Sequence, residues 1–170
     1  MPVDPTITVR DATEADLQAI LDIYNEAVLN STATADYEPQ SMVDRVEWFE
    51  LRKAQNLPIY VAVDNADRVL GWASLSRFHA RIGYRFTVEN SIYIGPDHRG
   101  KGTGGILLKR LIEAARAGGF HSIVADIDSK NDASIRLHRS HGFEDRGTIF
   151  HAVYKFDQWL DVFHMQLMLE

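Results

Sequence analysis

The feature that most constrains this chain is a β-rich run that leads through a glycine-rich turn into an apolar helix. The run is Val88–Ile94, the turn is Arg99–Gly105, and apolar side chains recur at helical spacing over Ile106–Ala115. Backbone N–H groups at the start of a helix bind anions, and glycines let a phosphate approach them without a clash against a Cβ atom. Two cations inside the turn, Arg99 and Lys101, suit a pyrophosphate better than they suit packing. The segment therefore predicts a binding site for a phosphorylated ligand.

Two well-known nucleotide-binding patterns almost fit this turn. The spacing from Gly95 to Gly100-Lys101 begins like the phosphate-binding loop of nucleotide hydrolases, but Gly102 stands where Ser or Thr must bind Mg²⁺. Gly100, Gly102 and Gly105 also satisfy the spacing of dinucleotide-binding proteins. However, about sixty residues follow the turn, which is too few for a doubly wound sheet with a substrate site. We reject both patterns, and a plain tight connection between strand and helix stays open as the structural alternative.

The rest of the chain alternates between short β-rich runs and amphipathic helices. Thr13, with an acid three residues later, predicts a helix that begins there and ends near Leu29. The small, polar stretch Asn30–Tyr37 predicts a loop, and a second helix is expected from Ser41 to a point before Asn56. Turn-forming residues divide the remainder, which predicts strands at 6–10, 59–63, 69–75, 88–94 and 123–127, a short helix at 131–141 and two β-rich runs within 143–169.

Composition limits the class of protein. The chain has 170 residues and no cysteine, which suits one globular domain, residues 1–170, and excludes disulfides, thiolate metal sites and a cysteine nucleophile. A net charge of −6 argues against nucleic acid as a partner. No apolar run is long enough to cross a bilayer, and the first residues lack the pattern of a signal peptide, so we expect a cytoplasmic protein without a membrane partner.

The glycine-rich turn also carries a family signature. Arg99–Gly104 matches the acyl-CoA pattern Arg/Gln-x-x-Gly-x-Gly/Ala, and the chain resembles the GNAT superfamily of N-acetyltransferases over nearly its whole length. Motifs at 87–94, 131–138, 142–143 and 154–161 narrow the resemblance to the phosphinothricin and methionine sulfone/sulfoximine acetyltransferase branch. The resemblance implies an α/β (α+β) fold, a mixed and mostly antiparallel sheet of about six or seven strands with about four flanking helices. It also implies that the sheet is splayed between its fourth and fifth strands, where acetyl-CoA binds.

The resemblance implies three groups of contacts with acetyl-CoA and no metal ion. The turn would hold the pyrophosphate, and main-chain groups of the preceding strand would pair with the pantetheine amides like an added strand. The short helix at 131–141 would contribute further side chains. In that order, the residues are Arg99, Gly100, Lys101, Gly102, Thr103 and Gly104; Ile92, Tyr93 and Ile94; and Asn131 and Ser134.

Transfer of an acetyl group to an amine needs a base, because an ammonium group must lose a proton before its nitrogen can attack. Glu89 is the candidate base, since it lies in an apolar run where loss of solvent raises the pKa of a carboxyl group. A solvent-facing or ion-paired glutamate is the alternative that the residues alone leave open. The match to the Thr87-Val88-Glu89 motif of the resembled branch favours the base, which would act directly or through a water.

His138 is the second catalytic candidate. Many members of the resembled superfamily have a tyrosine near this point that protonates the departing thiolate, whereas this branch has a histidine. An imidazole titrates near neutral pH and can serve as acid or base, and a buried structural histidine is the alternative. His138 and His141 lie on one predicted helix, but no further ligand follows at metal-binding spacing, so no zinc site is predicted.

The candidate acceptor-binding residues precede Glu89. Arg77, Arg81 and Arg85 lie close together in an otherwise acidic chain. Guanidinium groups bind carboxylate, sulfone and phosphinate oxygens through paired hydrogen bonds, which fits a zwitterionic amino acid whose α-amine attacks the thioester. Tyr84 and Thr87 lie beside them and complete the predicted acceptor site. A solvated, charge-balanced loop is the alternative.

The resulting hypothesis is an N-acetyltransferase that moves the acetyl group of acetyl-CoA to the α-amine of a small amino acid or analogue. The resemblance favours acceptors of the methionine sulfone/sulfoximine or phosphinothricin type and implies a homodimer, with 30–37 and 155–159 completing the pocket. Two alternatives stay open: acetylation of protein N-termini or lysines, and a non-catalytic acyl-CoA-binding module.

Overall fold

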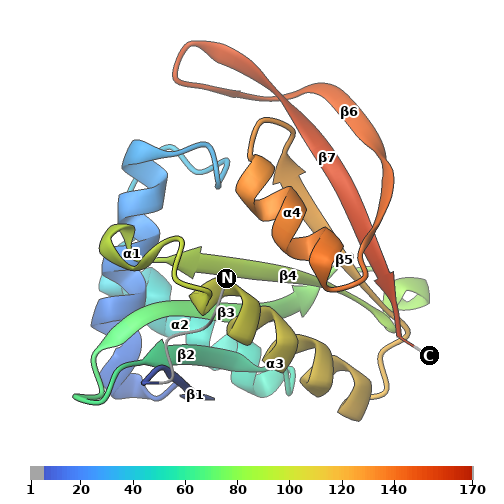
Figure 1. The fold of residues 1–170 in the computed structure, drawn as a ribbon. Coiled ribbons are helices and arrows are strands. Elements are labelled where there is room, and N and C mark those ends of the chain that lie inside the picture. The colour runs from blue at the N-terminus through green and yellow to red at the C-terminus, as the bar shows by residue number, and fades with distance from the viewer. Residues whose placement is uncertain (1–5, 170) are drawn as a thin grey trace.

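The computed structural model describes residues 6–169 and contains one seven-stranded sheet in the order β1-β2-β3-β4-β5-β7-β6 (Figure 1). Three short 3₁₀ helices, at 14–16, 82–84 and 96–98, connect the longer elements. The helices are α1 (Leu17–Asn30), α2 (Met42–Ala54), α3 (Thr103–Ala117) and α4 (Asp132–Ser140). The strands are β1 (Thr8–Asp11), β2 (Ile59–Val63), β3 (Val69–Arg77), β4 (Thr87–Ile94), β5 (Ser122–Asp128), β6 (Glu144–Lys155) and β7 (Gln158–Met168).

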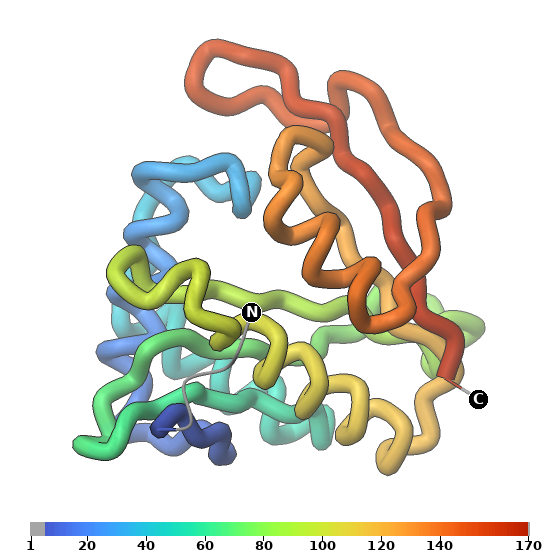
Figure 2. Tube along the Cα trace, in the orientation of Figure 1, coloured from blue at the N-terminus to red at the C-terminus, as the bar shows by residue number. Residues whose placement is uncertain are grey.

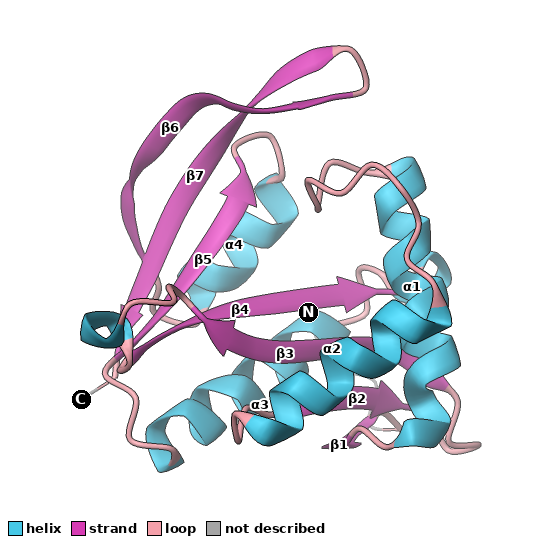
Figure 3. Ribbon diagram, turned by 180° about the vertical axis from the view of Figure 1, so that it is seen from behind, coloured by secondary structure: helices cyan, strands magenta, loops and turns pink. Residues whose placement is uncertain are grey.

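Helices cover both faces of the sheet around its first strands (Figure 3). Successive side chains of a strand point to opposite faces, so β2 contributes to two cores. Val61 packs in a cluster with Ile20 of α1 and Phe49 of α2, whereas Ala62 packs in a second cluster with Leu107 and other residues of α3. This two-sided burial explains why β2 consists of an uninterrupted apolar run rather than an alternating one.

The sheet splays at the junction of its two halves. β4 and β5 form the one parallel pair among the described strands, and their pairing ends at Glu89↔Val124. Beyond this point residues 90–94 still pair with β3, but they have no partner on their other edge. Figure 2 shows the two strands diverging. The predicted mixed, mostly antiparallel sheet with a split between its fourth and fifth strands is therefore confirmed.

The last two strands form a long β6–β7 hairpin whose tip projects beyond the helices (Figures 1 and 3). Its pairing shifts register between Ile149 and Val153, where His151 adopts a φ of 52°. The two β-rich runs expected within 143–169 are this hairpin. None of the helices within residues 6–169 is both long and apolar enough to cross a membrane.

The predicted helix boundaries agree with the structure except at the first helix. Ser41 caps α2 as expected, because its hydroxyl accepts a hydrogen bond from the Asp44 N–H at 3.2 Å. At Thr13, by contrast, a single 3₁₀ turn precedes α1, which begins at Leu17. Asp16 explains the difference, since its carboxylate binds both the Thr13 N–H, at 2.7 Å, and the Arg10 guanidinium, at 2.7 Å, and so fixes the turn to β1.

Candidate functional site

Two adjoining cavities flank the free edge of β4. The splay cavity, of about 340 Å³, lies where β4 and β5 diverge and is lined by residues 32–35, 89–93 and 125–128, with further residues from α4 and the hairpin. The turn cavity, of about 990 Å³, follows the start of α3 and the adjoining face of α4. Ile92, Tyr93, Asn131 and Ser134 line both, so the two cavities share one wall.

The glycine-rich turn forms one end of the turn cavity. Gly100 and Gly102 adopt φ values of 74° and 83°, which glycine tolerates and residues with a Cβ rarely do. Gly102 is the N-cap of α3, so the first backbone N–H groups of the helix point out of the turn without partners inside the helix. The buried Thr103 hydroxyl also has no hydrogen-bond partner among the described residues. This set of donors fits the pyrophosphate of acetyl-CoA.

The two cations of the turn make contacts with the protein itself. The Arg99 guanidinium donates to the Ile94 carbonyl at 3.1 Å and forms an ion pair with Glu26 at 2.6 Å. The Lys101 ammonium donates to the Asp97 carbonyl at 2.7 Å. Arg99 lines the turn cavity, whereas Lys101 does not. Both side chains therefore brace the turn, and their contact with phosphate stays a prediction.

The free edge of β4 offers main-chain donors and acceptors between the two cavities. Ile92, Tyr93 and Ile94 pair with β3 on one side only. An unpaired strand edge can bind an extended ligand as an additional strand, which matches the role predicted for these residues. At the facing wall, the Asn131 side chain caps α4 by accepting from the Ser134 N–H at 3.1 Å. Asn131 and Ser134 line both cavities, and their contact with the cofactor stays a prediction.

Glu89 lies at the floor of the splay cavity, at the last paired position of β4. The pKa of its carboxyl group is raised to about 6, chiefly by burial and to a lesser extent by the negative charge of Asp126. Arg52 of α2 and His164 of β7 act in the opposite direction. A carboxylate with this pKa is largely ionised at neutral pH and is a stronger base than an exposed glutamate.

His138 is buried and holds the wall of the splay cavity. Its Nδ1 lies 2.8 Å from the Ser134 carbonyl, to which it donates, and its Nε2 lies 2.9 Å from the Asn90 side-chain nitrogen, from which it accepts. This arrangement requires the neutral ring, and burial lowers the pKa of His138 accordingly. Both ring nitrogens are engaged, so an acid role for His138 would require the bond to Ser134 to break.

The predicted acceptor-binding residues do not reach the splay cavity. Among the residues that the structure describes, the lining of this cavity includes none of Arg77, Arg81, Tyr84, Arg85 and Thr87. They lie between the end of β3 and the start of β4, at the end of β4 opposite to the splay. Tyr84 packs against the rings of Phe78 and His79, and Thr87 lies 3.4 Å from the Ser122 hydroxyl. Their contact with an acceptor stays a prediction.

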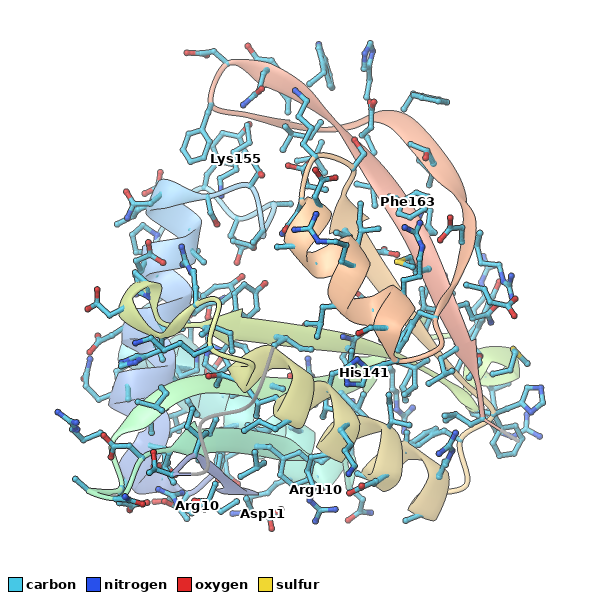
Figure 4. The ribbon with its side chains drawn as sticks, viewed as in Figure 1. Arg10, Asp11, Arg110, His141, Lys155 and Phe163 are labelled. Atoms are coloured by element: carbon cyan, nitrogen blue, oxygen red, sulfur yellow. The ribbon has the colours of Figure 1, made fainter. Side chains whose placement is uncertain are left out.

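The splay cavity is lined on one side by residues 32–35 of the loop after α1 rather than by the predicted acceptor-binding residues. The buried Lys155 ammonium donates to the Ser31 and Thr34 carbonyls, each at 2.9 Å, and Figure 4 shows its side chain between the hairpin and this loop. Thr32 donates to Asp128, and the Tyr37 hydroxyl donates to the Tyr154 carbonyl. The predicted pocket segments 30–37 and 155–159 therefore meet within one chain.

Sequence reasoning missed several charged residues around Glu89. Arg52, Asp126 and His164 come from three different elements and act on its carboxyl group electrostatically. The alternation of side chains along β5 and β7 could place Asp126 and His164 on one face, but only once the pairing of these strands is known.

Known proteins resemble this chain in sequence and in structure. The model of the acetyltransferase (GNAT) family matches residues 17–143. The L-methionine sulfoximine/L-methionine sulfone acetyltransferase of Pseudomonas aeruginosa is 49% identical over 96% of this chain and 95% of its own. The protein of the same description from Salmonella typhimurium is 43% identical, with the same coverage of 96% and 95%. A crystal structure of a phosphinothricin acetyltransferase from Sinorhizobium meliloti in complex with acetyl-CoA superposes with a TM-score of 0.94, at 41% identity, over 96% of this chain and 89% of that one.

Proposed function

The chain belongs to the acetyltransferase (GNAT) family, and from this premise we propose that it acetylates the α-amine of a small amino acid or analogue, with Glu89 as general base. It is an acetyl-CoA-dependent N-acetyltransferase. The acceptor class is that of methionine sulfoximine, methionine sulfone and phosphinothricin. The observation that carries the proposal is the half-buried Glu89 carboxyl group at the floor of the splay cavity, beside the free edge of β4.

The proposed reaction accounts for every proton. The acceptor enters as an ammonium group, and the Glu89 carboxylate removes one proton, directly or through a water. The free amine attacks the thioester carbonyl carbon, a C–N bond forms and the C–S bond breaks. The nitrogen loses a second proton, which ends on the thiolate sulfur. Each turnover thus releases one proton, which Glu89 must pass to solvent before the next cycle.

The surrounding residues position the two substrates. Acetyl-CoA supplies the activated acetyl group, and the start of α3 and the free edge of β4 would hold its pyrophosphate and pantetheine arm. His138 in its neutral form holds the Asn90 side chain at the wall of the cavity. The acid role predicted for His138 would draw on its Nδ1 proton.

The acceptor class is tested by thiol release from acetyl-CoA, measured with a disulfide dye. The panel contains methionine sulfone, methionine sulfoximine, phosphinothricin, ordinary L-amino acids, a polyamine and short peptides with free N-termini. We expect saturable release with the first three acceptors. Release with peptides alone would instead support acetylation of protein N-termini or lysines. Calorimetric binding of acetyl-CoA without release for any amine would support a non-catalytic binding module.

The general base is tested by Glu89→Gln. The amide keeps the size of the side chain but cannot take a proton, so we expect kcat to fall by about 10²–10³-fold. The Kd of acetyl-CoA, measured by calorimetry, should stay within about twofold because Glu89 does not line the turn cavity. Glu47→Gln, on the exposed side of α2, is the matched control. Equal losses in turnover and in acetyl-CoA binding would contradict the role of Glu89 as base.

We also propose that the chain forms a homodimer through the β6–β7 hairpin. Ile149, Phe150, Phe156 and Trp159 expose between 50% and 74% of their surface there. Exposed apolar side chains at this density favour a protein partner over water, and a second copy supplies the same surface. Sedimentation analysis should give a dimer for the wild-type chain and a monomer for Phe150→Asp. A monomeric wild-type chain would contradict the proposal.

A further inference from the structure

A buried cation lies behind the loop that lines the splay cavity. Arg45 belongs to α2 and exposes only 2% of its surface. Its guanidinium carbon lies 4.6 Å from the ring centroids of Tyr24 and Trp48, and 5.5 Å from that of Trp72. Its Nε has no hydrogen-bond partner among the described residues. The charge is therefore surrounded mainly by aromatic rings.

Core packing alone does not require a cation at this position. A buried guanidinium loses its hydration, and this loss lowers the pKa of Arg45. The aromatic rings offset part of that cost through cation–π contacts. A methionine side chain is of similar length and packs against aromatic rings without any loss of hydration. What distinguishes Arg45 from an apolar residue is thus the polar contact that its guanidinium makes.

That contact begins a chain of hydrogen bonds. Arg45 Nη2 donates to Gln40 Oε1 at 2.6 Å, and Gln40 Nε2 donates to the Asp36 carboxylate at 3.3 Å. The same carboxylate oxygen accepts from the Tyr24 hydroxyl at 2.6 Å. Two further bonds, at 2.9 and 2.8 Å, fix the backbone of Gln40 to the Asn25 side chain on α1. Since the Tyr24 ring also contacts the guanidinium, the chain closes on itself.

The chain reaches the wall of the splay cavity at Thr34. The Thr34 hydroxyl oxygen lies 3.0 Å from that of Tyr24. Because Tyr24 gives its hydrogen to Asp36, Thr34 must be the donor in this pair. The Thr34 oxygen also accepts from the Asp36 N–H at 3.2 Å. Thr34 lines the splay cavity, so its hydroxyl can only accept a hydrogen bond from a ligand there.

The same loop residue is held from the opposite side. The buried Lys155 ammonium of the hairpin donates to the Thr34 carbonyl at 2.9 Å. Two buried cations, one on α2 and one on the hairpin, thus act on Thr34 from elements far apart in the sequence. Buried charges that break the usual rules of core formation are typical of functional sites.

We propose that Arg45 is a positioning residue for the acceptor. It fixes the Asp36 carboxylate and the Tyr24 hydroxyl, which in turn hold the hydroxyl of Thr34. The Thr34 oxygen then accepts a hydrogen bond from the ammonium group of the acceptor. The inference rests on the proposed function, because this ammonium group is the one that Glu89 deprotonates. Arg45 itself lies outside the lining of the splay cavity, so it acts through the other residues.

Arg45→Met tests the role of the charge. With methionine sulfone varied at saturating acetyl-CoA, we expect the KM of the acceptor to rise by about tenfold. Both kcat and the Kd of acetyl-CoA should stay within about twofold, and Arg45→Lys should give an intermediate KM. Arg110→Met is the matched control and should keep the wild-type KM. The Arg110 guanidinium also contacts a ring, that of Tyr60 at 4.7 Å, but Arg110 lines neither cavity.

A double-mutant cycle distinguishes positioning from support of the fold. Thr34→Val removes the hydroxyl at the end of the chain and should itself raise the KM of the acceptor by about tenfold. Adding Arg45→Met to Thr34→Val should then have little further effect, because both changes break one chain. If Arg45 only supported the fold, the two factors would multiply. Asp36→Ala, at an exposed position, breaks the same chain without disturbing the core and replaces Arg45→Met in the cycle if that variant does not fold.

Three results would overturn the inference: a wild-type KM of the acceptor in folded Arg45→Met, a wild-type KM in Asp36→Ala, and factors that multiply in the double variant. The wild-type chain separates this inference from the proposed function. A wild-type chain that releases no thiol with any acceptor would remove the proposed function and the role of Arg45 with it. An active wild-type chain with unaffected variants would remove the role of Arg45 alone.

Discussion

The two cavities that meet along β4 are built in opposite ways. The turn cavity takes most of its lining from two stretches of chain, 92–109 and 131–141. The splay cavity combines the loop after α1, the middle of β4, the end of β5, α4 and both strands of the hairpin. The first is made largely by local backbone geometry, whereas the second exists only after distant strands have paired.

The difference matters for what each cavity can recognise. Backbone N–H groups at a helix start and along a strand edge bind phosphate and amide groups with little dependence on side-chain identity. Side chains such as Glu89, Asp126 and His138 line or flank the splay cavity, so its chemistry changes with each substitution. We therefore expect substitutions in the turn cavity to weaken mainly the binding of acetyl-CoA. Substitutions in the splay cavity should mainly impair use of the acceptor.

On the cofactor side, the largest effect is expected from Gly102→Val. Gly102 caps α3 with a φ of 83°, a conformation that a β-branched residue adopts only with strain. The turn should rearrange and the Kd of acetyl-CoA, measured by calorimetry, should rise by about 100-fold. Gly83→Ala is the control, because no atom lies within 4 Å of the added Cβ. Unchanged binding in Gly102→Val would show that the backbone of the turn does not hold the cofactor.

The contrast between the cavities also explains what the sequence could predict. The strand, turn and helix around Gly102 are consecutive, so glycine spacing and apolar periodicity predicted these elements, and a phosphate site between them, without knowledge of the tertiary structure. Glu89 could be proposed as a base for the same reason, since it lies within that segment. The fold followed from the resemblance together with these local patterns.

The surroundings of Glu89 could not be predicted in this way. Asp126 and His164 are 38 residues apart, and only the β5–β7 pairing makes them neighbours. Lys155 contacts carbonyls more than 120 residues earlier in the chain. Conversely, Arg77, Arg81 and Arg85 are close in sequence to Glu89 but lie at the other end of β4 from the splay. Closeness in sequence to Glu89 therefore did not place their side chains in the lining of the splay cavity.

A pH profile should reveal the base of the splay cavity and leave the turn cavity unaffected. The pKa of Glu89 is raised to about 6, mainly by burial, and the proposed base is its ionised form. Activity must therefore rise with pH through about 6, and at pH 5 kcat/KM should be about a tenth of its value above pH 7. Acetyl-CoA binding should vary by less than about twofold over this range. A rate that is independent of pH between 5 and 7 would contradict an active carboxylate with this pKa.

The smallest effect is expected from the contact that holds the loop after α1 over the splay cavity. In Lys155→Met the Ser31 and Thr34 carbonyls lose their buried donor, so the loop should become more mobile. The KM of the acceptor should rise by about fivefold, and the Kd of acetyl-CoA should stay nearly unchanged. Lys130→Met, at an exposed position just after β5, is the control. Steady-state kinetics with the acceptor varied at saturating acetyl-CoA measures the first quantity and calorimetry the second. Loss of a contact confined to the loop leaves the start of α3 and the edge of β4 intact. Equal weakening of acceptor binding and acetyl-CoA binding would therefore contradict this prediction, and would mean that the buried Lys155 ammonium supports the whole splayed half of the sheet.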